Sequence, residues 1–325
     1  MRVKSMKKIV VLSTIVMITL TSCVSSNETS NISRENIIIA DQFGLAYAPL
    51  EVMKHESFLE ASLSEAGLES VKIEWKKFGN TTAIREAMLS GDLDIGFVGI
   101  PPFLLGLDNG MNWKVMTGLS ESRVSLVTKD PNVNTLADLS QSHRIILPQP
   151  GSIQHILLQM ASYKAFGDAK KFDKQLLAMS HPDGVIAFAS GDINQLHFTT
   201  PPFLQEDLKI DHASEVINGE SSFGGAFTFI VGICQASLYD DRDVYDAFNK
   251  ALQKSVDFMN EHPAETLSIL KKAYEYDMDD LEMYMSNEQM HFSTEVKGME
   301  TFVDFMFSSG MIKKAYKNND LFWEE

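Results

Sequence analysis

The hydrophobic and polar positions of this chain alternate between short apolar runs and longer segments with helical spacing. Apolar runs rich in β-branched residues predict strands at residues 37–40, 71–75, 93–98, 113–118, 123–128 and 145–147. Helical patterns between these runs predict helices at residues 82–89 and 154–166. This alternation predicts an α/β fold with mainly parallel sheets that helices cover on both faces.

The last part of the chain differs, because helical spacing dominates there. Residues 244–259, 264–274 and 299–307 carry apolar side chains at helical spacing, and Pro263 lies where a helix start accepts proline. The segment is also acidic. We interpret it as a group of helices that packs against the rest of the fold.

The N-terminal segment has the pattern of an export signal. Residues 1–8 are basic, residues 9–20 are apolar, and Leu20-Thr21-Ser22-Cys23 follows. Such a run is too short to cross a bilayer, which needs about 20 residues of helix. The ending resembles the bacterial lipobox, in which the cysteine is acylated; an ordinary signal with an incidental cysteine is the alternative. We predict a signal peptide at residues 1–22, lipidation of Cys23 and a polar tether over residues 23–34.

The length, the net charge and the cysteine, histidine and motif content narrow the class of protein. The 325 residues suggest about two domains. A net charge of −16 with no basic run after Lys8 argues against a nucleic-acid partner. After the signal only Cys234 remains, and we expect it to be buried rather than paired or metal-bound. The eight histidines show no zinc spacing, and nucleophile and phosphate-loop motifs do not occur, so we expect no metal, cofactor or catalytic residue.

An internal repeat is the basis for predicting a function. SGDLDIGFVGIPPFL at residues 90–104 and SGDINQLHFTTPPFL at residues 190–204 share their first three residues and their Pro-Pro-Phe-Leu. In each copy we expect a helix to end at glycine with positive φ and a strand to follow. The first proline should then hold its predecessor outside the α region. Gly99-Ile100 and Thr199-Thr200 would follow equivalent strand ends, where open α/β sheets bind ligands. A duplicated turn without a ligand is the alternative.

These features resemble the periplasmic substrate-binding proteins of ABC importers. The resemblance rests on Asp41-Gln42-Phe43-Gly44, Ala46-Tyr47-Ala48-Pro49, the first repeat copy and Pro150-Gly151-Ser152. The most similar branch is the nitrate/sulfonate/taurine group, which includes relatives of the yeast thiamine-pyrimidine synthase. The resemblance implies the two-lobed type II fold with a ligand cleft between the lobes. Lobe 1 would comprise residues 35–121 and 225–325, and lobe 2 residues 122–224.

The resemblance, carried over residue by residue, implies a binding site with contributions from both lobes. Lobe 1 would contribute Gln42, Phe43, Tyr47, Asn80, Thr81, Gly99 and Ile100, and lobe 2 would contribute Gly151, Ser152, Gln154, Thr199 and Thr200. Aromatic faces would bury part of the ligand, and hydroxyls and helix N–H groups would orient it. Any single position can also serve as a helix cap or a packed aromatic.

The predicted ligand is a small organic molecule. Because the matched loops carry aromatic residues but no Arg or Lys, we prefer an aromatic heterocycle such as a vitamin precursor, a thiamine pyrimidine or a flavin-like ring. A small anion such as an alkanesulfonate, taurine or nitrate is the alternative.

The resemblance also implies partners and a location. We expect a non-enzymatic monomer in the bacterial cell envelope, lipid-anchored on the extracytoplasmic side, that delivers its ligand to an ABC permease and ATPase. A surface adhesin or sensor-input lipoprotein with no transport role is the alternative from another class.

Overall fold

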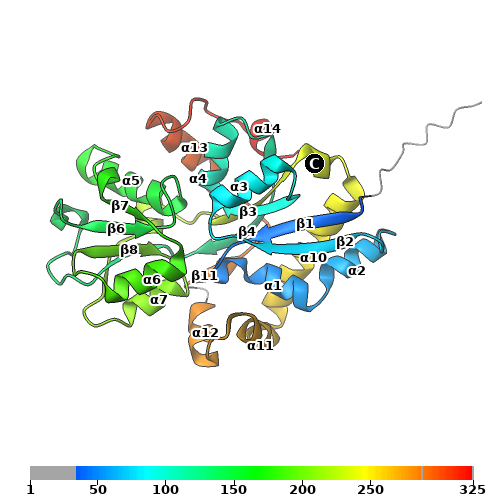
Figure 1. The fold of residues 1–325 in the computed structure, drawn as a ribbon, viewed down its shortest axis with the longest axis horizontal. Helices are drawn as coiled ribbons and strands as arrows, with labels where there is room; N and C mark the ends of the chain where they lie inside the picture. Colours follow the sequence, from blue (N-terminus) through cyan, green and yellow to red (C-terminus); the bar gives the residue numbers. More distant parts are fainter. Residues whose placement is uncertain (1–33, 287, 324–325) are drawn as a thin grey trace, which may run out of the picture. The chain divides into compact units, whose positions relative to one another are not determined.

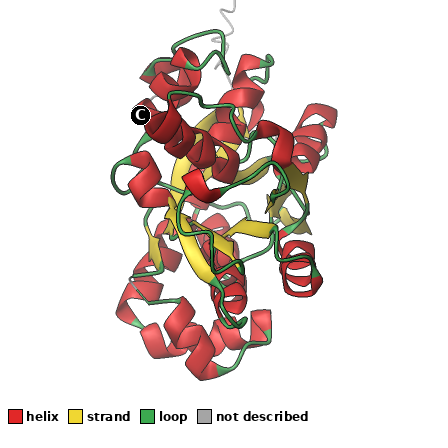
Figure 2. Ribbon diagram, turned by 90° about the vertical axis from the view of Figure 1, so that its left-hand side faces the viewer, coloured by secondary structure: helices red, strands yellow, loops and turns green. Residues whose placement is uncertain are grey.

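The computed structural model describes residues 34–286 and 288–323, which form two β-sheets with helices packed around them (Figures 1 and 2). The predicted signal peptide, the lipidation site Cys23 and nearly all of the tether lie outside the described residues. We call the part of the molecule around each sheet a lobe.

The first sheet has six strands in the order β11-β4-β10-β3-β1-β2. These are β1 (Asn36–Asp41), β2 (Lys72–Lys77), β3 (Ile95–Gly99), β4 (Trp113–Ser122), β10 (Ile230–Gln235) and β11 (Met290–Phe292). All five residues of β3 are buried. Cys234 is buried in β10, as predicted, and burial raises the pKa of its thiol to about 12.

The second sheet has five strands in the order β7-β6-β8-β5-β9. These are β5 (Ser125–Thr128), β6 (Arg144–Leu147), β7 (Leu176–Ala178), β8 (Gln195–Thr199) and β9 (Ser214–Asn218). The chain changes sheet between β4 and β5, and it returns between β9 and β10.

Helices connect the strands and cover both sheets (Figure 2). The helices that precede β5 or follow β10 in the chain are α1 (Ala48–His55), α2 (Phe58–Glu65), α3 (Thr81–Ser90), α4 (Ile100–Asp108), α9 (Ala236–Tyr239), α10 (Arg242–Glu261), α11 (Pro263–Tyr274), α12 (Met278–Tyr284), α13 (Met299–Ser308) and α14 (Asn318–Leu321). The helices between β5 and β10 are α5 (Ile153–Phe166), α6 (His181–Ser190), α7 (Phe203–Leu208) and α8 (Gly219–Phe223). Short 3₁₀ turns lie at Leu45–Tyr47, Leu136–Asp138 and Asp173–Gln175.

The long helix α10 shows why the C-terminal segment folds as predicted. Val244, Phe248, Leu252 and Val256 recur at helical spacing and are all buried. This face packs against α1 and α2, so the C-terminal helices complete the first lobe.

The expectation of mainly parallel sheets is wrong, because both sheets are mixed. β1 pairs parallel with β2 and β3, whereas β10 pairs antiparallel with β3 and β4, and β11 with β4. In the second sheet β6 pairs parallel with β7 and β8, whereas β5 pairs antiparallel with β8 and β9. The chain passes from one sheet to the other twice, between β4 and β5 and between β9 and β10. No helical crossover joins a strand that follows such a passage to its neighbours in the sheet. Because parallel pairing of consecutive strands depends on such a crossover, these strands can pair antiparallel.

The repeat places its two strands as predicted, but its two copies turn differently. Gly91 ends α3 with φ 81°, as expected, whereas Gly191 is extended at φ −82°. Glycine is required there because a Cβ would collide with the backbone carbonyl oxygen of Ala187. In the first copy Ile100 is already the first residue of α4, with the two prolines in its first turn, where their missing N–H groups cost nothing. The expected exclusion of Ile100 from the helix is therefore wrong.

Candidate functional site

The parallel strands of both sheets end at one small cavity between the two lobes. The cavity has a volume of about 50 Å³. Residues that follow β1, β2, β3, β6, β7 and β8 reach it, which is where open α/β sheets bind ligands. Its lining comprises Gln42, Phe43, Ala46, Tyr47, Gly79, Thr81, Gly99, Pro102, Pro148, Gln149, Ser152, Ile153, Gln154, His181, Thr200, Phe229 and Ile230.

The first lobe contributes hydroxyl and amide groups to this cavity. The Gln42 amide donates to the Thr81 hydroxyl oxygen at 3.3 Å and to the Phe97 carbonyl at 3.1 Å, so its orientation is fixed. Tyr47 is buried, and burial raises the pKa of its hydroxyl well above the ordinary value. Among the described residues this hydroxyl has no hydrogen-bond partner. It is a neutral donor that is available to a ligand.

Four helices from the two lobes begin at the cavity wall. α3 is capped by Asn80, whose side chain accepts from the Ala83 N–H at 3.1 Å, and α5 is capped by Ser152, which accepts from the His155 N–H at 3.3 Å. α4 begins after Gly99 and α6 begins with His181. Helix N-termini carry free N–H groups and a partial positive charge. No lining side chain is an Asp, Glu, Lys or Arg, so these N-termini supply the positive partial charges at the wall itself. The buried carboxylate of Asp41 lies behind the wall and acts on Tyr47.

His181 is the titratable side chain in the second lobe's part of the wall. Its Nε2 lies 3.2 Å from the Gln154 amide nitrogen, and its Nδ1 lies 2.9 Å from the Thr199 hydroxyl. With the amide donating to Nε2, the ring carries its proton on Nδ1 and donates to Thr199. Burial lowers the pKa of His181 to about 3, so the ring is neutral at ordinary pH.

A buried histidine holds the loop at the start of α5. Gly151 has φ +83°, and its N–H donates to His155 Nδ1 at 2.9 Å. On the other side of the ring, Nε2 lies 3.1 Å from an Asp173 carboxylate oxygen. Because Nδ1 accepts, Nε2 carries the proton and donates to Asp173. His155 thereby fixes the loop that presents Gln149 and Ser152 to the cavity.

The two lobes also contact each other directly beside the cavity. The Thr82 hydroxyl of α3 donates to the Gln149 side-chain oxygen at 3.3 Å. This leaves the Gln149 amide nitrogen without a partner among the described residues, and it remains a donor at the cavity wall.

Eight of the twelve predicted site residues line the cavity and four do not. The eight are Gln42, Phe43, Tyr47, Thr81, Gly99, Ser152, Gln154 and Thr200. Asn80 is a helix cap behind the wall, and Ile100 is buried in the core. Gly151 turns the α5 loop, and Thr199 contacts His181. These four support lining residues and do not themselves line the cavity.

Sequence reasoning missed several lining residues. Gln149 follows the predicted strand at 145–147 and could have been found by the strand-end rule. His181 begins α6, which the hydrophobic pattern did not reveal, although Ser180 and Pro182 are typical of a helix start. Phe229 and Ile230 reach the cavity because β10 runs antiparallel and starts at the same edge.

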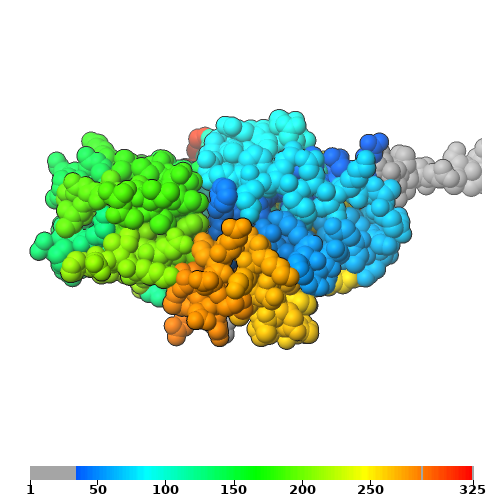
Figure 3. Space-filling view, turned by 60° about the horizontal axis from the view of Figure 1, so that its bottom comes forward, coloured from blue at the N-terminus to red at the C-terminus, as the bar shows by residue number. Residues whose placement is uncertain are grey.

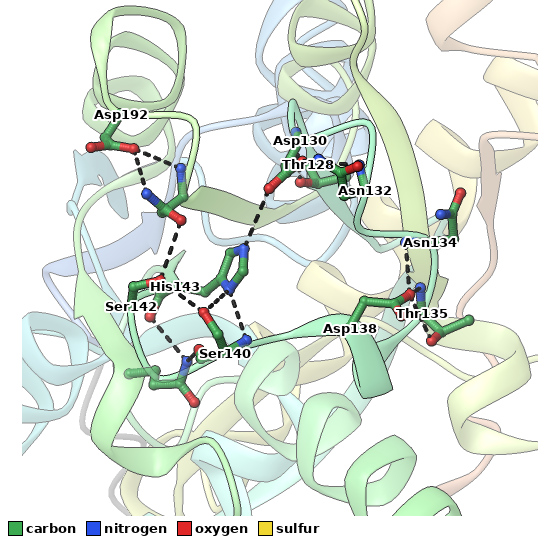
Figure 4. A network of polar contacts seen from close by, with 12 residues as sticks. Thr128, Asp130, Asn132, Asn134, Thr135, Asp138, Ser140, Ser142, His143 and Asp192 are labelled. Atoms are coloured by element: carbon green, nitrogen blue, oxygen red, sulfur yellow. Dashed lines mark hydrogen bonds and ion pairs between the residues drawn. The ribbon is translucent and has the colours of Figure 1, made fainter.

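A second polar network lies around the opposite ends of the second sheet's strands (Figure 4). His143 Nδ1 accepts from the Ser140 N–H at 2.9 Å, while Asp192 accepts from the Asn194 N–H at 2.9 Å. Asp138 and Thr135 form a capping box. β5 ends and β6 and β8 begin near these loops, so the network stabilises turns remote from the cavity.

The described residues contain neither a membrane-spanning helix nor a cluster of metal ligands. None of their helices combines the length and apolar character needed to cross a bilayer. Nor do they contain a group of three or more His, Cys, Asp or Glu side chains placed to hold a metal ion.

Comparison with solved structures shows the fold. The alkanesulfonate-binding protein SsuA from Xanthomonas axonopodis pv. citri, bound to MOPS, has a TM-score of 0.73 and 19% identity over 90% of this chain and 99% of that one. The periplasmic nitrate-binding protein NrtA from Synechocystis PCC 6803 has a TM-score of 0.67 and 12% identity over 86% and 82% of the two chains. A Candida albicans protein described as having the generic periplasmic binding protein fold has a TM-score of 0.66 and 15% identity over 88% and 93%.

No protein-family model and no curated protein sequence matches the chain. The structural relatives include sulfonate- and nitrate-binding proteins, the group named from the sequence. The predicted two-lobed α/β architecture is confirmed, and the chain has the fold of the periplasmic binding proteins.

Proposed function

We propose that this protein is the solute-binding component of an ABC importer and that its ligand carries a compact oxyanion, foremost a sulfonate. One observation supports this most strongly. Four helix N-termini and several hydroxyl and amide groups, from both lobes, surround a cavity with no charged side chain.

The donor set suits an oxyanion. The hydroxyls of Tyr47, Ser152 and Thr200 and the amide of Gln149 can all donate. The first turns of α3 and α5, which contain no proline, add free N–H groups. Each helix dipole stabilises an anion by about 0.3–1 kcal/mol at exposed sites and by more when partly buried. An anion held in this way needs no Arg or Lys.

The same geometry favours the anion over the heterocycle that we preferred from the sequence. Benzene fills a cavity of about 150 Å³, whereas this cavity has about 50 Å³. A ring does not fit inside it, but a sulfonate or nitrate group does. The structural relatives described as sulfonate- and nitrate-binding proteins support the same choice.

Capture would proceed by closure of the lobes. A ligand that contacts both lobes stabilises their closed arrangement, which is the form that a permease recognises. The proposal places the protein outside the cytoplasm as a lipid-anchored monomer that binds without catalysis, with a permease and an ATPase as partners. The relatives described as periplasmic and ABC-import proteins support this location and these partners.

Calorimetric titration with methanesulfonate tests the proposal, with methanesulfonamide as its uncharged counterpart. We expect methanesulfonate to bind and to raise the Tm, and methanesulfonamide to bind at least tenfold more weakly. Equal affinity for the two would show that the cavity does not recognise an anion.

The Tyr47 hydroxyl offers a sharper test. Tyr47→Phe removes a donor that has no protein partner, so the fold should keep its stability. A hydrogen bond to a charged group contributes about 1.5–3 kcal/mol, so affinity for methanesulfonate should fall by about tenfold or more. Tyr163→Phe, on the exposed side of α5, is the matched control. An unchanged affinity in Tyr47→Phe would mean that this hydroxyl does not bind the ligand.

A further inference from the structure

A second, larger chamber adjoins the small cavity. It has a volume of about 490 Å³ and shares Phe43 with the inner cavity. His181 and Thr200 line the inner cavity, and their near neighbours Pro182 and Pro202 line the outer chamber. The two spaces are therefore consecutive parts of one cleft between the lobes.

The walls of the outer chamber are mainly apolar and aromatic. Five large side chains line it, each from a different helix or loop: Phe43, Ile186, Phe203, Tyr274 and Tyr276. The Phe203 ring stacks on His181, with centroids 5.4 Å apart and planes 11° from parallel, so it separates the outer chamber from the neutral histidine of the inner wall. Phe43 remains 45% exposed although it is a large apolar side chain. An apolar ligand group would cover it.

The charges in the outer chamber do not suit an anion. Lys77 lies 3.4 Å from Glu51 and 3.9 Å from Asp41, and both carboxylates bind Lys54 as well. Its charge is thus already paired. Glu206 and Glu275 add two carboxylates to the wall. An anionic head group is repelled there and is directed into the inner cavity.

The end of α11 closes this chamber from the first lobe. Residues 273–276 form one wall, and the Tyr274 hydroxyl donates to the Gly44 carbonyl at 3.2 Å, beside Phe43. In the space-filling view the α11–α12 segment, coloured yellow to orange, lies against the surfaces of both lobes (Figure 3). Residues from both lobes therefore form the walls of the outer chamber.

We propose that the outer chamber is a second subsite, which takes an aromatic or alicyclic ring attached to the anionic head in the inner cavity. This inference rests on the proposed function and narrows the ligand to ring-bearing organic anions. A bare inorganic anion or a one-carbon sulfonate would leave the outer chamber and the Phe43 face unused.

The test compares benzenesulfonate with methanesulfonate by calorimetric titration of the full chain. Both ligands carry the same sulfonate group, so the ratio of their affinities reports how much the outer chamber contributes to binding. We expect benzenesulfonate to bind about tenfold more tightly, as stacking on one aromatic side chain predicts.

Two variants should weaken this preference. Phe43→Ala removes the shared aromatic face, and Ile186→Trp fills the chamber from an exposed position that a folded chain tolerates. Ile186→Trp should bring the affinity ratio close to one while methanesulfonate still binds, because Ile186 lines only the outer chamber. Phe43→Ala also alters the wall of the inner cavity, so for this variant the expected result is a lower ratio of the two affinities, with the methanesulfonate affinity measured in the same variant. Phe307→Ala is the matched control, because Phe307 is 46% exposed on α13 and lines neither space.

The outcomes separate the two proposals. Equal affinity for the two sulfonates in the unaltered chain, or a ratio that neither variant changes, would overturn the second subsite and leave the proposed function in place. Failure of both sulfonates to bind would overturn the proposed function, and the subsite with it.

Discussion

Two neighbouring histidines of the second lobe, His181 and His197, are kept neutral by burial. His181 lies at the cavity wall, and burial lowers its pKa to about 3. His197 is fully buried, with Nδ1 2.7 Å from Asp207, and burial lowers the pKa of His197 and raises the pKa of Asp207. Burial thus favours the neutral form of both partners.

Because of its low pKa, His181 makes the stability of the folded chain depend on pH. Below about pH 6.5 the unfolded chain protonates this histidine and the folded chain does not, so stability falls as the pH falls. By pH 5 the loss amounts to about 2 kcal/mol. Urea unfolding at pH 7.5 and pH 5 should show this loss in the unaltered chain and a smaller loss in His181→Gln. His262→Gln, an exposed histidine, is the control. Equal losses in the chain and in His181→Gln would mean that His181 is charged in the folded protein.

The strand-end rule predicts individual site residues only where the strand itself is evident. Gly99 ends a strand with a clear apolar run, so the internal repeat was enough to predict it. Tyr47 and Thr81 were implied by the family resemblance, because β2 is half exposed and gives no clear apolar run. His181 follows the three-residue strand β7 and opens a helix interrupted by Gly184, so neither element gave a pattern. The residues of the outer chamber come together from positions near 43, 186, 203 and 274, and a local pattern carries no information on that assembly.

The start of α5 illustrates how an element positions its loop. Its cap Ser152 satisfies one backbone N–H, and the first-turn residue His155 reaches back to the N–H of Gly151. The arrangement requires an unprotonated Nδ1, which the Asp173 carboxylate secures by accepting from Nε2. The sequence predicts the helix and its cap, but not the partner at Asp173, because that contact depends on a 3₁₀ turn beyond the end of the helix.

Asp173→Asn tests this arrangement. An asparagine can donate to Nε2 and thereby move the ring proton to Nδ1, which then no longer accepts from Gly151. We expect the loop to loosen and the affinity for methanesulfonate to fall about five- to tenfold, while the far-UV circular dichroism stays unchanged. Asp168→Asn, in the exposed loop after α5, is the control. If Asp173→Asn binds like the unaltered chain, the histidine does not position the site.

The segment formed by α11 and α12 connects the lobes across the outer chamber. Lys209, which ends α7 of the second lobe, lies 2.8 Å from Asp280 of α12 and 3.1 Å from the Tyr284 hydroxyl. α11 packs against α1 and α10 of the first lobe. From the sequence we expected a packed group of helices only, because apolar spacing shows that a helix packs but not what it bridges. If the lobes close on a ligand as proposed, these contacts would give the segment a second role, as a latch on their closed arrangement.

Lys209→Met should therefore affect ligand release more than folding. The ion pair is largely exposed, so its loss should lower the unfolding free energy by less than about 1 kcal/mol. Because Lys209 and Asp280 lie on opposite sides of the cleft, that energy is lost from the closed form in particular, and the dissociation rate of benzenesulfonate in stopped-flow measurements should rise up to about fivefold.

Lys250→Met is the matched control for this latch. Lys250 pairs with Glu65 at 2.5 Å within the first lobe, and its side chain is 55% exposed, against 53% for Lys209. Both changes remove one surface charge and one ion pair, so both should lower stability equally. They should differ in release, because only Lys209 joins the lobes. Equal release rates in the two variants would mean that the lobes close without this latch and that α12 serves as packing alone.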